Sequence, residues 1–94
     1  MTNEKFLEMA KEKVYEYEHK RGNHIKLSDV YIVWSCKTLQ NSKALLSGNN
    51  KEKRTLYYEF TLNGDRWEFY MDAYEKIENI CFNSNGDIKN EIVK

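Results

Sequence analysis

The sequence predicts one α+β domain, residues 1–94, in which an N-terminal helix packs on a four-stranded, mostly antiparallel sheet and a short C-terminal helix follows. Two patterns lead to this prediction: helical spacing of apolar residues near the N-terminus, and strand-like alternation on both sides of an Asn-Gly pair. A chain of 94 residues has room for one core. We expect the ordered core to span about residues 3–82 and assign no structure to the tail beyond it.

The first segment has the pattern of an amphipathic helix. Apolar residues recur at spacings of one, three and four, which places them on one stripe. They are Phe6, Leu7, Ala10, Val14 and Tyr17. Thr2 or Asn3 is suited to cap the start of the helix, and Gly22 is suited to end it. The other positions carry charges of both signs, so the helix is predicted to pack through one side only.

Four strands are predicted, of which the last two form a hairpin. β-branched and aromatic residues dominate residues 29–36, the first strand. By alternation, one face of this strand is expected to point into the core. That face carries Val30, Ile32, Trp34 and Cys36, and the opposite face carries Tyr31, Ser35 and Lys37. A turn at residues 39–42 and a short second strand at residues 43–47 follow.

Asn63-Gly64 is the strongest local feature, since this dipeptide favours a two-residue type I′ turn between antiparallel strands. The flanking residues alternate, so this turn would place three apolar pairs opposite each other on the buried face. The pairs are Phe60 with Trp67, Tyr58 with Phe69, and Leu56 with Met71. Gly64 is then expected to have a positive φ.

The periodicity changes after Asp72. Asp72-Ala73-Tyr74-Glu75 matches a capping box, and Ile77, Ile80 and Cys81 follow at helical spacing. These features predict a short second helix that ends near residue 81 or 82.

Composition excludes several classes of protein. Fifteen basic and fifteen acidic residues give a formal net charge of zero. The sequence therefore lacks both the basic excess of a nucleic-acid binder and the acidic excess of a nucleic-acid mimic. It has no apolar run long enough to span a bilayer and no signal-peptide core at its start. We expect a cytoplasmic protein whose two cysteines, Cys36 and Cys81, stay reduced.

The sequence carries no catalytic or metal-binding signature. Cys36 with His19 or His24 would supply a nucleophile and a base. However, Cys36 is in phase with the predicted core residues, where cysteine acts as a small hydrophobe. The Cys and His positions also lack zinc-site spacing. We predict no catalytic residues, no metal and no cofactor.

The outer face of the predicted hairpin is the first candidate site. The same register opposes Glu59 to Glu68 and Tyr57 to Tyr70, with Asp72 beside them. Directly opposed carboxylates destabilise a sheet unless the face is solvated, a basic group intervenes or a ligand binds there. One hypothesis is an acidic, tyrosine-bearing surface for a basic partner. The alternative is a solvated outer face without a ligand; two carboxylates alone do not define glycosidase or metal chemistry.

A polar corner at the turn between the first two strands is the second candidate. It consists of Lys37, Gln40, Asn41 and Lys43. With the basic residues of the segment 51–54, it would suit an acidic partner or a nucleic-acid backbone. The alternative is an ordinary solubilising loop.

Residues 33–45, with the sequence VWSCKTLQNSKAL, are the most distinctive stretch. Together with residues 57–59 (YYE), 63–65 (NGD) and 70–74 (YMDAY), they resemble a family of short uncharacterised proteins of phages and prophages of Gram-positive bacteria. The resemblance runs from the first helix to about residue 82. It implies a small accessory protein made in the cytoplasm of a bacterial host, and it supplies no catalytic residue.

The functional expectation combines these observations. We expect a non-enzymatic protein that binds and modulates a host protein, with defence nucleases among the candidate partners. The alternative is a nucleic-acid-binding accessory of phage replication or recombination. An enzyme is the third choice, and membrane association is not expected.

Overall fold

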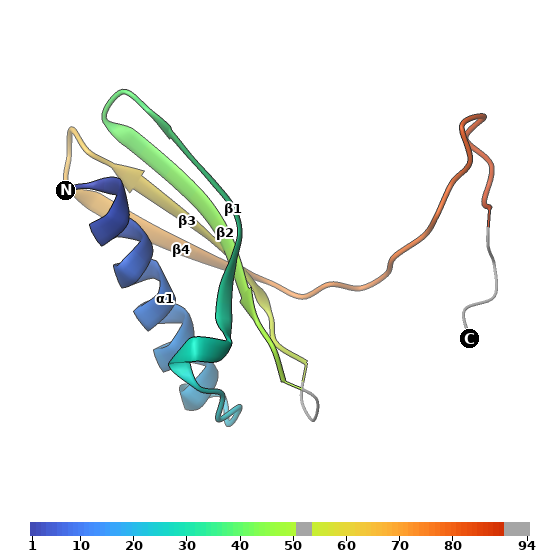
Figure 1. Cartoon of the computed structure of the whole chain (residues 1–94), viewed down its shortest axis with the longest axis horizontal. Helices are drawn as coiled ribbons and strands as arrows, with labels where there is room; N and C mark the ends of the chain where they lie inside the picture. The colour runs from blue at the N-terminus through green and yellow to red at the C-terminus, as the bar shows by residue number, and fades with distance from the viewer. Residues whose placement is uncertain (51–53, 90–94) are drawn as a thin grey trace.

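The structure, a computed structural model, describes residues 1–50 and 54–89 and has two layers, with one helix lying across one face of a sheet (Figure 1). The elements are helix α1 (Asn3–Lys20), a 3-10 turn η1 (Leu27–Asp29) and strands β1 (Val30–Thr38), β2 (Asn41–Gly48), β3 (Tyr57–Asn63) and β4 (Glu68–Tyr74). The strands pair antiparallel in the order β1-β2-β3-β4. The predicted helix on a four-stranded antiparallel sheet is confirmed.

Helix α1 begins and ends at the predicted signals. Thr2 is the N-cap, and its hydroxyl accepts a hydrogen bond from the Lys5 amide at 3.1 Å. At the other end Gly22 has φ 88°, and the Asn23 amide donates to the Glu18 carbonyl at 2.8 Å. This is a Schellman-type end, which requires the left-handed conformation that glycine adopts without strain.

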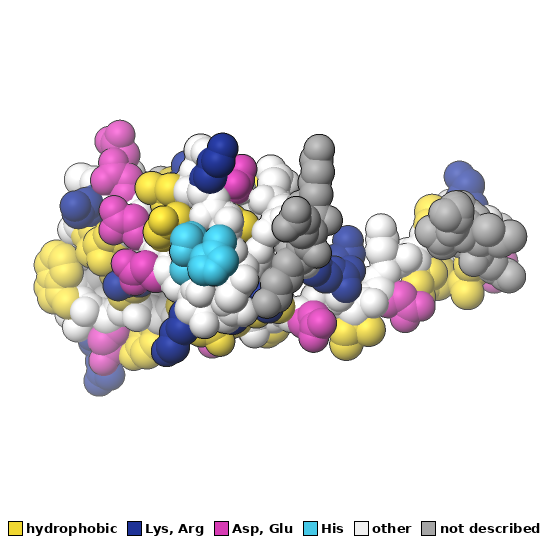
Figure 2. All heavy atoms as spheres, turned by 90° about the horizontal axis from the view of Figure 1, so that it is seen from below, with side chains coloured by type: hydrophobic (Ala, Val, Ile, Leu, Met, Phe, Trp, Pro, Cys, Tyr) yellow, Lys and Arg dark blue, Asp and Glu magenta, His cyan; other side chains and the backbone are white. Residues whose placement is uncertain are grey.

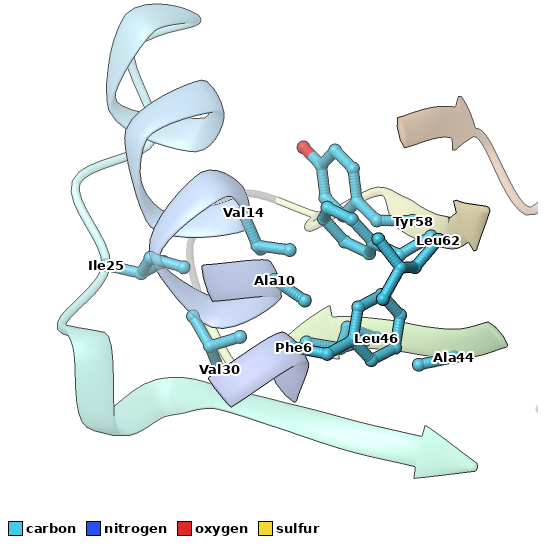
Figure 3. Packing of buried hydrophobic residues seen from close by; sticks show 10 residues of the cluster. Phe6, Ala10, Val14, Ile25, Val30, Ala44, Leu46, Tyr58 and Leu62 are labelled. Atoms are coloured by element: carbon cyan, nitrogen blue, oxygen red, sulfur yellow. The ribbon is translucent and has the colours of Figure 1, made fainter. Parts of the chain in front are cut away.

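The core lies between α1 and the middle of the sheet (Figure 3). The helix contributes Phe6, Ala10 and Val14, all completely buried. The sheet and the links to it contribute Ile25, Val30, Ala44, Leu46, Tyr58, Phe60 and Leu62. The ring of Phe69 on β4 closes the cluster edge-on to Phe6, with ring centroids 5.7 Å apart.

One charged residue, Glu18, is completely buried at the end of this core. Its Oε1 accepts hydrogen bonds from Arg21 Nε at 2.9 Å and Asn23 Nδ2 at 2.8 Å. Its Oε2 accepts from the Leu56 amide at 3.1 Å and from the Tyr58 hydroxyl. Every lone pair therefore has a donor, which is what a buried carboxylate needs to remain ionised.

The environment of Glu18 shifts two pKa values. Burial alone would raise the pKa of Glu18, but hydrogen bonds, from Tyr58 above all, and the Arg21 charge outweigh it and hold that pKa below its ordinary value. Burial and the bond to Glu18 raise the pKa of Tyr58. The pair is therefore a neutral phenol donating to a carboxylate.

A bulge in β1 overturns the predicted faces of that strand. Ile32 pairs with Leu46, but Trp34 pairs with Leu45, so Val33 is an extra residue. Beyond a one-residue bulge, alternate side chains change face. Trp34 and Cys36, predicted to lie in the core, are consequently exposed on the side of the sheet away from α1. Ser35 and Lys37, predicted to point outward, instead share the face of Ala44 and Ser42, with which they pair.

The β3–β4 hairpin forms, but its register differs from the prediction. Phe60 pairs with Met71, Leu62 with Phe69 and Tyr58 with Ala73. The connection is residues 64–67 rather than Asn63-Gly64, and Trp67, predicted to be a core residue, lies in it with φ 55° and 71% of its surface exposed. The observed register differs from the predicted one by four residues. Because this is an even number, Phe69 and Met71 keep the predicted face of the sheet.

Two local interactions explain the longer connection. The Asn63 side chain accepts from the Asp65 amide at 3.2 Å, and its carbonyl accepts from the Arg66 amide at 3.3 Å, so the chain turns around Asn63. Gly64 does not have the predicted positive φ. It lies instead against the β1–β2 turn, where a Cβ at position 64 would be 2.2 Å from the Gln40 carbonyl oxygen.

The predicted C-terminal helix is absent from the described part of the chain. Asp72, Ala73 and Tyr74 complete β4, and residues 75–89, here called the arm, extend away from the domain (Figure 1). The Cα radius of gyration, 15.9 Å, exceeds the roughly 12 Å of a compact chain of this length because of the arm. Pairing of residues 72–74 with β3 overrides the capping-box pattern.

Gly64→Ala should destabilise the fold by roughly 1–3 kcal/mol, because the new methyl group would collide with backbone that cannot move as freely as a side chain. Urea unfolding of the variant and the parent measures the difference. Asp65→Ala, in the same connection, is the control and should change stability by less than about 0.5 kcal/mol. Equal stability of the two variants would contradict the close contact of the two turns.

Glu18→Gln should cost roughly 1–3 kcal/mol, because an amide cannot accept all four donors that the carboxylate satisfies. It should also change how strongly the free energy of unfolding falls when the pH is lowered into the acidic range. The stabilisation from Glu18 is complete above the ordinary pKa of 4.5 and is lost as the pH falls through the lowered folded-state value. The variant should therefore lose less stability than the parent between neutral and acidic pH. Glu16→Gln, at an exposed position, is the control, and an unchanged fall of the free energy of unfolding with pH in Glu18→Gln would refute the assignment.

Candidate functional site

The sheet has one face that α1 does not cover, here called the outer face. Strand alternation and the cross-strand pairing place a row of side chains from each strand on this face. The rows are Tyr31, Trp34, Cys36 and Thr38 on β1; Asn41, Lys43 and Leu45 on β2; Tyr57, Glu59, Thr61 and Asn63 on β3; and Glu68, Tyr70, Asp72 and Tyr74 on β4. The described residues include no second layer over this face.

Large aromatic side chains are the main feature of the outer face. Tyr31, Trp34, Tyr70 and Tyr74 expose 38–50% of their surface, and Tyr57 is half-buried beside Tyr74, with which it pairs. Aromatic residues in this number are typical of protein interfaces, where each supplies contact area at a small cost in conformational entropy. A solvated sheet face without a ligand normally carries short polar residues instead.

Charge is concentrated on the β3 and β4 side of this face. Glu59 lies directly opposite Asp72, an unfavourable pair of like charges. On its other side Glu59 forms a salt bridge of 3.1 Å with Lys43 of β2. The bridge offsets the repulsion by little, since both partners are partly exposed. Among the described residues, Asp72 forms no salt bridge, so the face has an acidic end.

Two tyrosine hydroxyls are held in this acidic end. Tyr70 donates to Glu68 at 2.6 Å, and that hydrogen bond raises the pKa of Tyr70. The charge of Asp72, followed by burial and the charge of Glu59, raises the pKa of Tyr74. Both phenols therefore remain neutral donors at physiological pH. Chemically, this arrangement offers aromatic surface, phenolic donors and carboxylate acceptors to a binding partner.

All five residues of the first candidate site lie on the outer face. The structure brings Tyr57, Glu59, Glu68, Tyr70 and Asp72 together, although their opposed partners are not the predicted ones. Tyr57 pairs with Tyr74 rather than Tyr70, and Glu68 pairs with Asn63 rather than Glu59. The grouping survives because the register changed by an even number of residues.

The structure divides the second candidate, the polar corner. Lys37 is on the side of the sheet that faces α1, whereas Lys43 and Asn41 are on the outer face. Gln40 lies in the two-residue turn with Leu39, which has φ 56° and is 85% exposed. The four residues thus do not form one surface. Of the basic residues in segment 51–54 that were grouped with this corner, Lys51 and Lys53 lie outside the described part of the chain.

Sequence reasoning missed the β1 contribution to the outer face, above all Trp34. Strict alternation from Val30 placed Trp34 in the core, and only the bulge at Val33 reverses it. The sequence offers one indication that alternation fails at the end of β1. Polar residues there occupy both faces of the strand, namely Ser35, Lys37 and Thr38, so neither face is apolar. Tyr74 was missed because it was assigned to the predicted helix.

The Cys and His residues form no candidate catalytic or metal site. Cys36 and Cys81 are free and exposed, and Cys36 is remote from His19, which contacts the Ile25 carbonyl at 2.8 Å. His19 and His24 lie side by side on the surface, with ring nitrogens 3.2 Å apart (Figure 2). Within residues 1–50 and 54–89, no group of three His, Cys, Asp or Glu side chains is placed to bind a metal ion. No helix in this part of the chain is long and apolar enough to cross a membrane.

The fold and the site together define a small two-layer α+β domain with an open, aromatic sheet face. Residues 4–84 match DUF6275, a family of unknown function, and the chain belongs to this family. The match includes α1, all four strands and most of the arm. Comparisons with curated proteins and with solved structures gave no match.

Glu68→Gln should lower the pKa of Tyr70 towards its ordinary value of 10.0, because it removes the charged acceptor that stabilises the protonated phenol. An NMR titration of the Tyr70 ring resonances against pH measures the shift. Glu12→Gln, at an exposed position of α1 on the other side of the sheet, is the control and should leave the Tyr70 titration unchanged. An unchanged Tyr70 pKa in Glu68→Gln would show that the two side chains do not interact in solution.

Proposed function

We propose that this chain is a small, non-enzymatic accessory protein that binds a host protein through its outer face. The observation that carries the proposal is the open sheet face, on which Tyr31, Trp34, Tyr70 and Tyr74 are exposed next to carboxylates. A few such aromatic residues commonly supply most of the energy of a protein interface.

The charge of the outer face supports a protein partner over a nucleic acid. Its described rows hold three carboxylates, Glu59, Glu68 and Asp72, against one lysine, Lys43, which is already paired with Glu59. Aromatic side chains on an open antiparallel sheet can also stack on the bases of single-stranded RNA. Such faces, however, need cationic groups for the phosphates, and this one is acidic at the β4 side.

The partner that fits is therefore a protein with a basic and partly apolar surface. Surfaces of this kind are the ones with which nucleases and other nucleic-acid enzymes hold a phosphate backbone. An acidic, tyrosine-bearing face would compete with nucleic acid for such a surface. This reasoning, together with the resemblance to phage and prophage proteins, supports a role in the host cytoplasm in which the protein modulates a host enzyme, such as a defence nuclease.

Nucleic-acid binding in phage replication or recombination stays the alternative hypothesis. It rests on Lys37, Gln40, Asn41 and Lys43, which the fold distributes over two faces. It therefore has less structural support than protein binding.

The test compares capture of host proteins by four versions of the chain. The parent, Trp34→Ala with Tyr74→Ala, Tyr70→Ala with Glu68→Lys, and the control Leu39→Ala are immobilised and incubated with host lysate. The captured protein is then purified and its Kd measured. Both outer-face variants should bind at least roughly tenfold more weakly, since truncation of a central aromatic residue commonly costs more than 1 kcal/mol.

The control and a parallel assay make the test decisive. Leu39 lies in the β1–β2 turn, is 85% exposed and lies outside the outer-face rows, so Leu39→Ala should bind like the parent. DNA and RNA retention is measured at two salt concentrations, with Lys37→Glu as the matched variant. Salt-sensitive retention that Lys37→Glu abolishes would favour the alternative function. Outer-face variants that bind like the parent would refute the proposed site.

A further inference from the structure

The arm carries apolar side chains that the domain does not cover. Ile77 is 88% exposed, and Ile80, Phe82 and Ile88 are 42–56% exposed. Figure 2 shows apolar side chains standing out along the arm where it projects from the domain. Large residues in these numbers on one short segment are not expected of a segment that stays in water.

The end of the arm is nevertheless organised. Phe82 and Ile88 form an antiparallel bridge, and the Lys89 amide donates to the Cys81 carbonyl at 2.8 Å. The Asn83 side chain accepts from the amides of Asn85 and Asp87 at 2.9 and 3.0 Å. An isolated two-stranded turn of this size is marginally stable in water. The end of the arm is therefore a preformed element over which the described residues place no second layer.

The two edges of the sheet are protected to different degrees. The β1 edge has the bulge at Val33 and a lysine, Lys37, both of which discourage pairing with another strand. The β4 edge has the sequence EFYMDAY, with neither bulge, proline nor lysine, and it pairs on its one partnered side in a regular register of seven residues. Within the described residues, no strand lies on its other side. The β4 edge can therefore accept a strand.

A groove lies beside the β4 edge on the side that faces α1. Its volume is about 350 Å³, and it is lined by Lys13, Glu16, Tyr17, Lys20, Phe69 and Met71. Tyr17, part of the predicted apolar stripe of the helix, is 38% exposed here because α1 packs mainly on β1, β2 and β3. The groove thus has an apolar floor, and its wall carries Lys20 and the Lys13–Glu16 ion pair.

We propose that the arm of one copy of this chain pairs with the β4 edge of a second copy, and that the exchange is reciprocal. Residues 75–81 of the arm continue β4 directly and equal it in length, so two such segments can align antiparallel about a two-fold axis. Each arm then covers the open edge and the groove of the other copy. The result is one continuous sheet across the dimer.

Symmetry determines which side chains of the arm enter the groove. A two-fold axis normal to the sheet keeps each residue on the same face in both copies, and directly opposed residues of an antiparallel pair share a face. Odd-numbered residues must therefore oppose odd-numbered ones. Ile77 then lies beside Met71 and Phe69 of the second copy, on the groove side, while Ile80 and Phe82 extend the outer face.

A second copy fits this edge better than the chain's own arm or a foreign strand. Between Tyr74 and Cys81 the arm has no glycine or proline at which to reverse, so it leads away from its own groove. Glu75, which the same parity places on the groove side, is opposite in sign to Lys20 on the groove wall. Reciprocal exchange also buries both arms at once, whereas a foreign strand would leave the arm exposed.

The experiment measures the mass of the full chain in solution by sedimentation equilibrium at micromolar concentrations, with hydrogen exchange of the arm amides as a second measurement. Versions to compare are the parent, Ile77→Asp, and the control Leu39→Asp. Ile77 contacts little in its own chain, so Ile77→Asp should keep the circular dichroism of the parent. The parent and Leu39→Asp should sediment as dimers with slowly exchanging amides at residues 75–80. Ile77→Asp should sediment as a monomer with fast exchange there.

Three outcomes would overturn the proposal. A monomeric parent with protected arm amides would mean that the arm folds onto its own chain. A monomeric parent with unprotected amides would mean that no second copy binds. A dimer that survives Ile77→Asp would place the interface elsewhere.

Discussion

The buried carboxylate of Glu18 is the constraint on which the arrangement of the layers depends. Because an ionised group cannot stay buried without donors, its four hydrogen bonds must all be present in the folded state. The donors come from the end of α1, the link after it, the residue before β3 and β3 itself. Arg21 extends this network to the Arg54 carbonyl at 2.6 Å. One side chain therefore determines where the helix ends and where it crosses the sheet.

That crossing leaves two surfaces open. A helix is about 10 Å wide and strands lie about 4.8 Å apart, so one helix covers roughly two to three of the four strands. With its end held at Tyr58 of β3, α1 lies over β1, β2 and β3 and leaves the groove beside β4. The outer face receives no second layer from the described chain. Both proposed interfaces follow from having one helix for a four-stranded sheet.

The sequence predicted on which face of the sheet a side chain lies more accurately than it predicted the cross-strand partner of that residue. Periodicity identified Phe6, Ala10 and Val14 as core residues and placed Tyr57, Glu59, Glu68, Tyr70 and Asp72 on one face, because these assignments depend only on parity. The hairpin register depends on how Asn63 and Gly64 meet the neighbouring turn, a tertiary contact that local turn preference does not contain. Trp34 was misplaced for a related reason, since one extra residue at Val33 reverses parity and alternation alone does not reveal it.

The segment after Asp72 shows why local pattern and final structure can disagree. Residues 72–75 satisfy a capping box, yet Asp72 and Ala73 also complete a ladder with Glu59 and Tyr58, and the cross-strand contacts decide between the two structures. Once residues 72–74 are in the strand, the helix loses its first turn and must nucleate later, in a segment too short to do so alone. Within the described residues, Ile77 and Ile80 then have neither a helix nor a neighbouring strand to pack against. In the proposed exchange, the β4 edge and groove of a second copy supply the surface against which these residues pack.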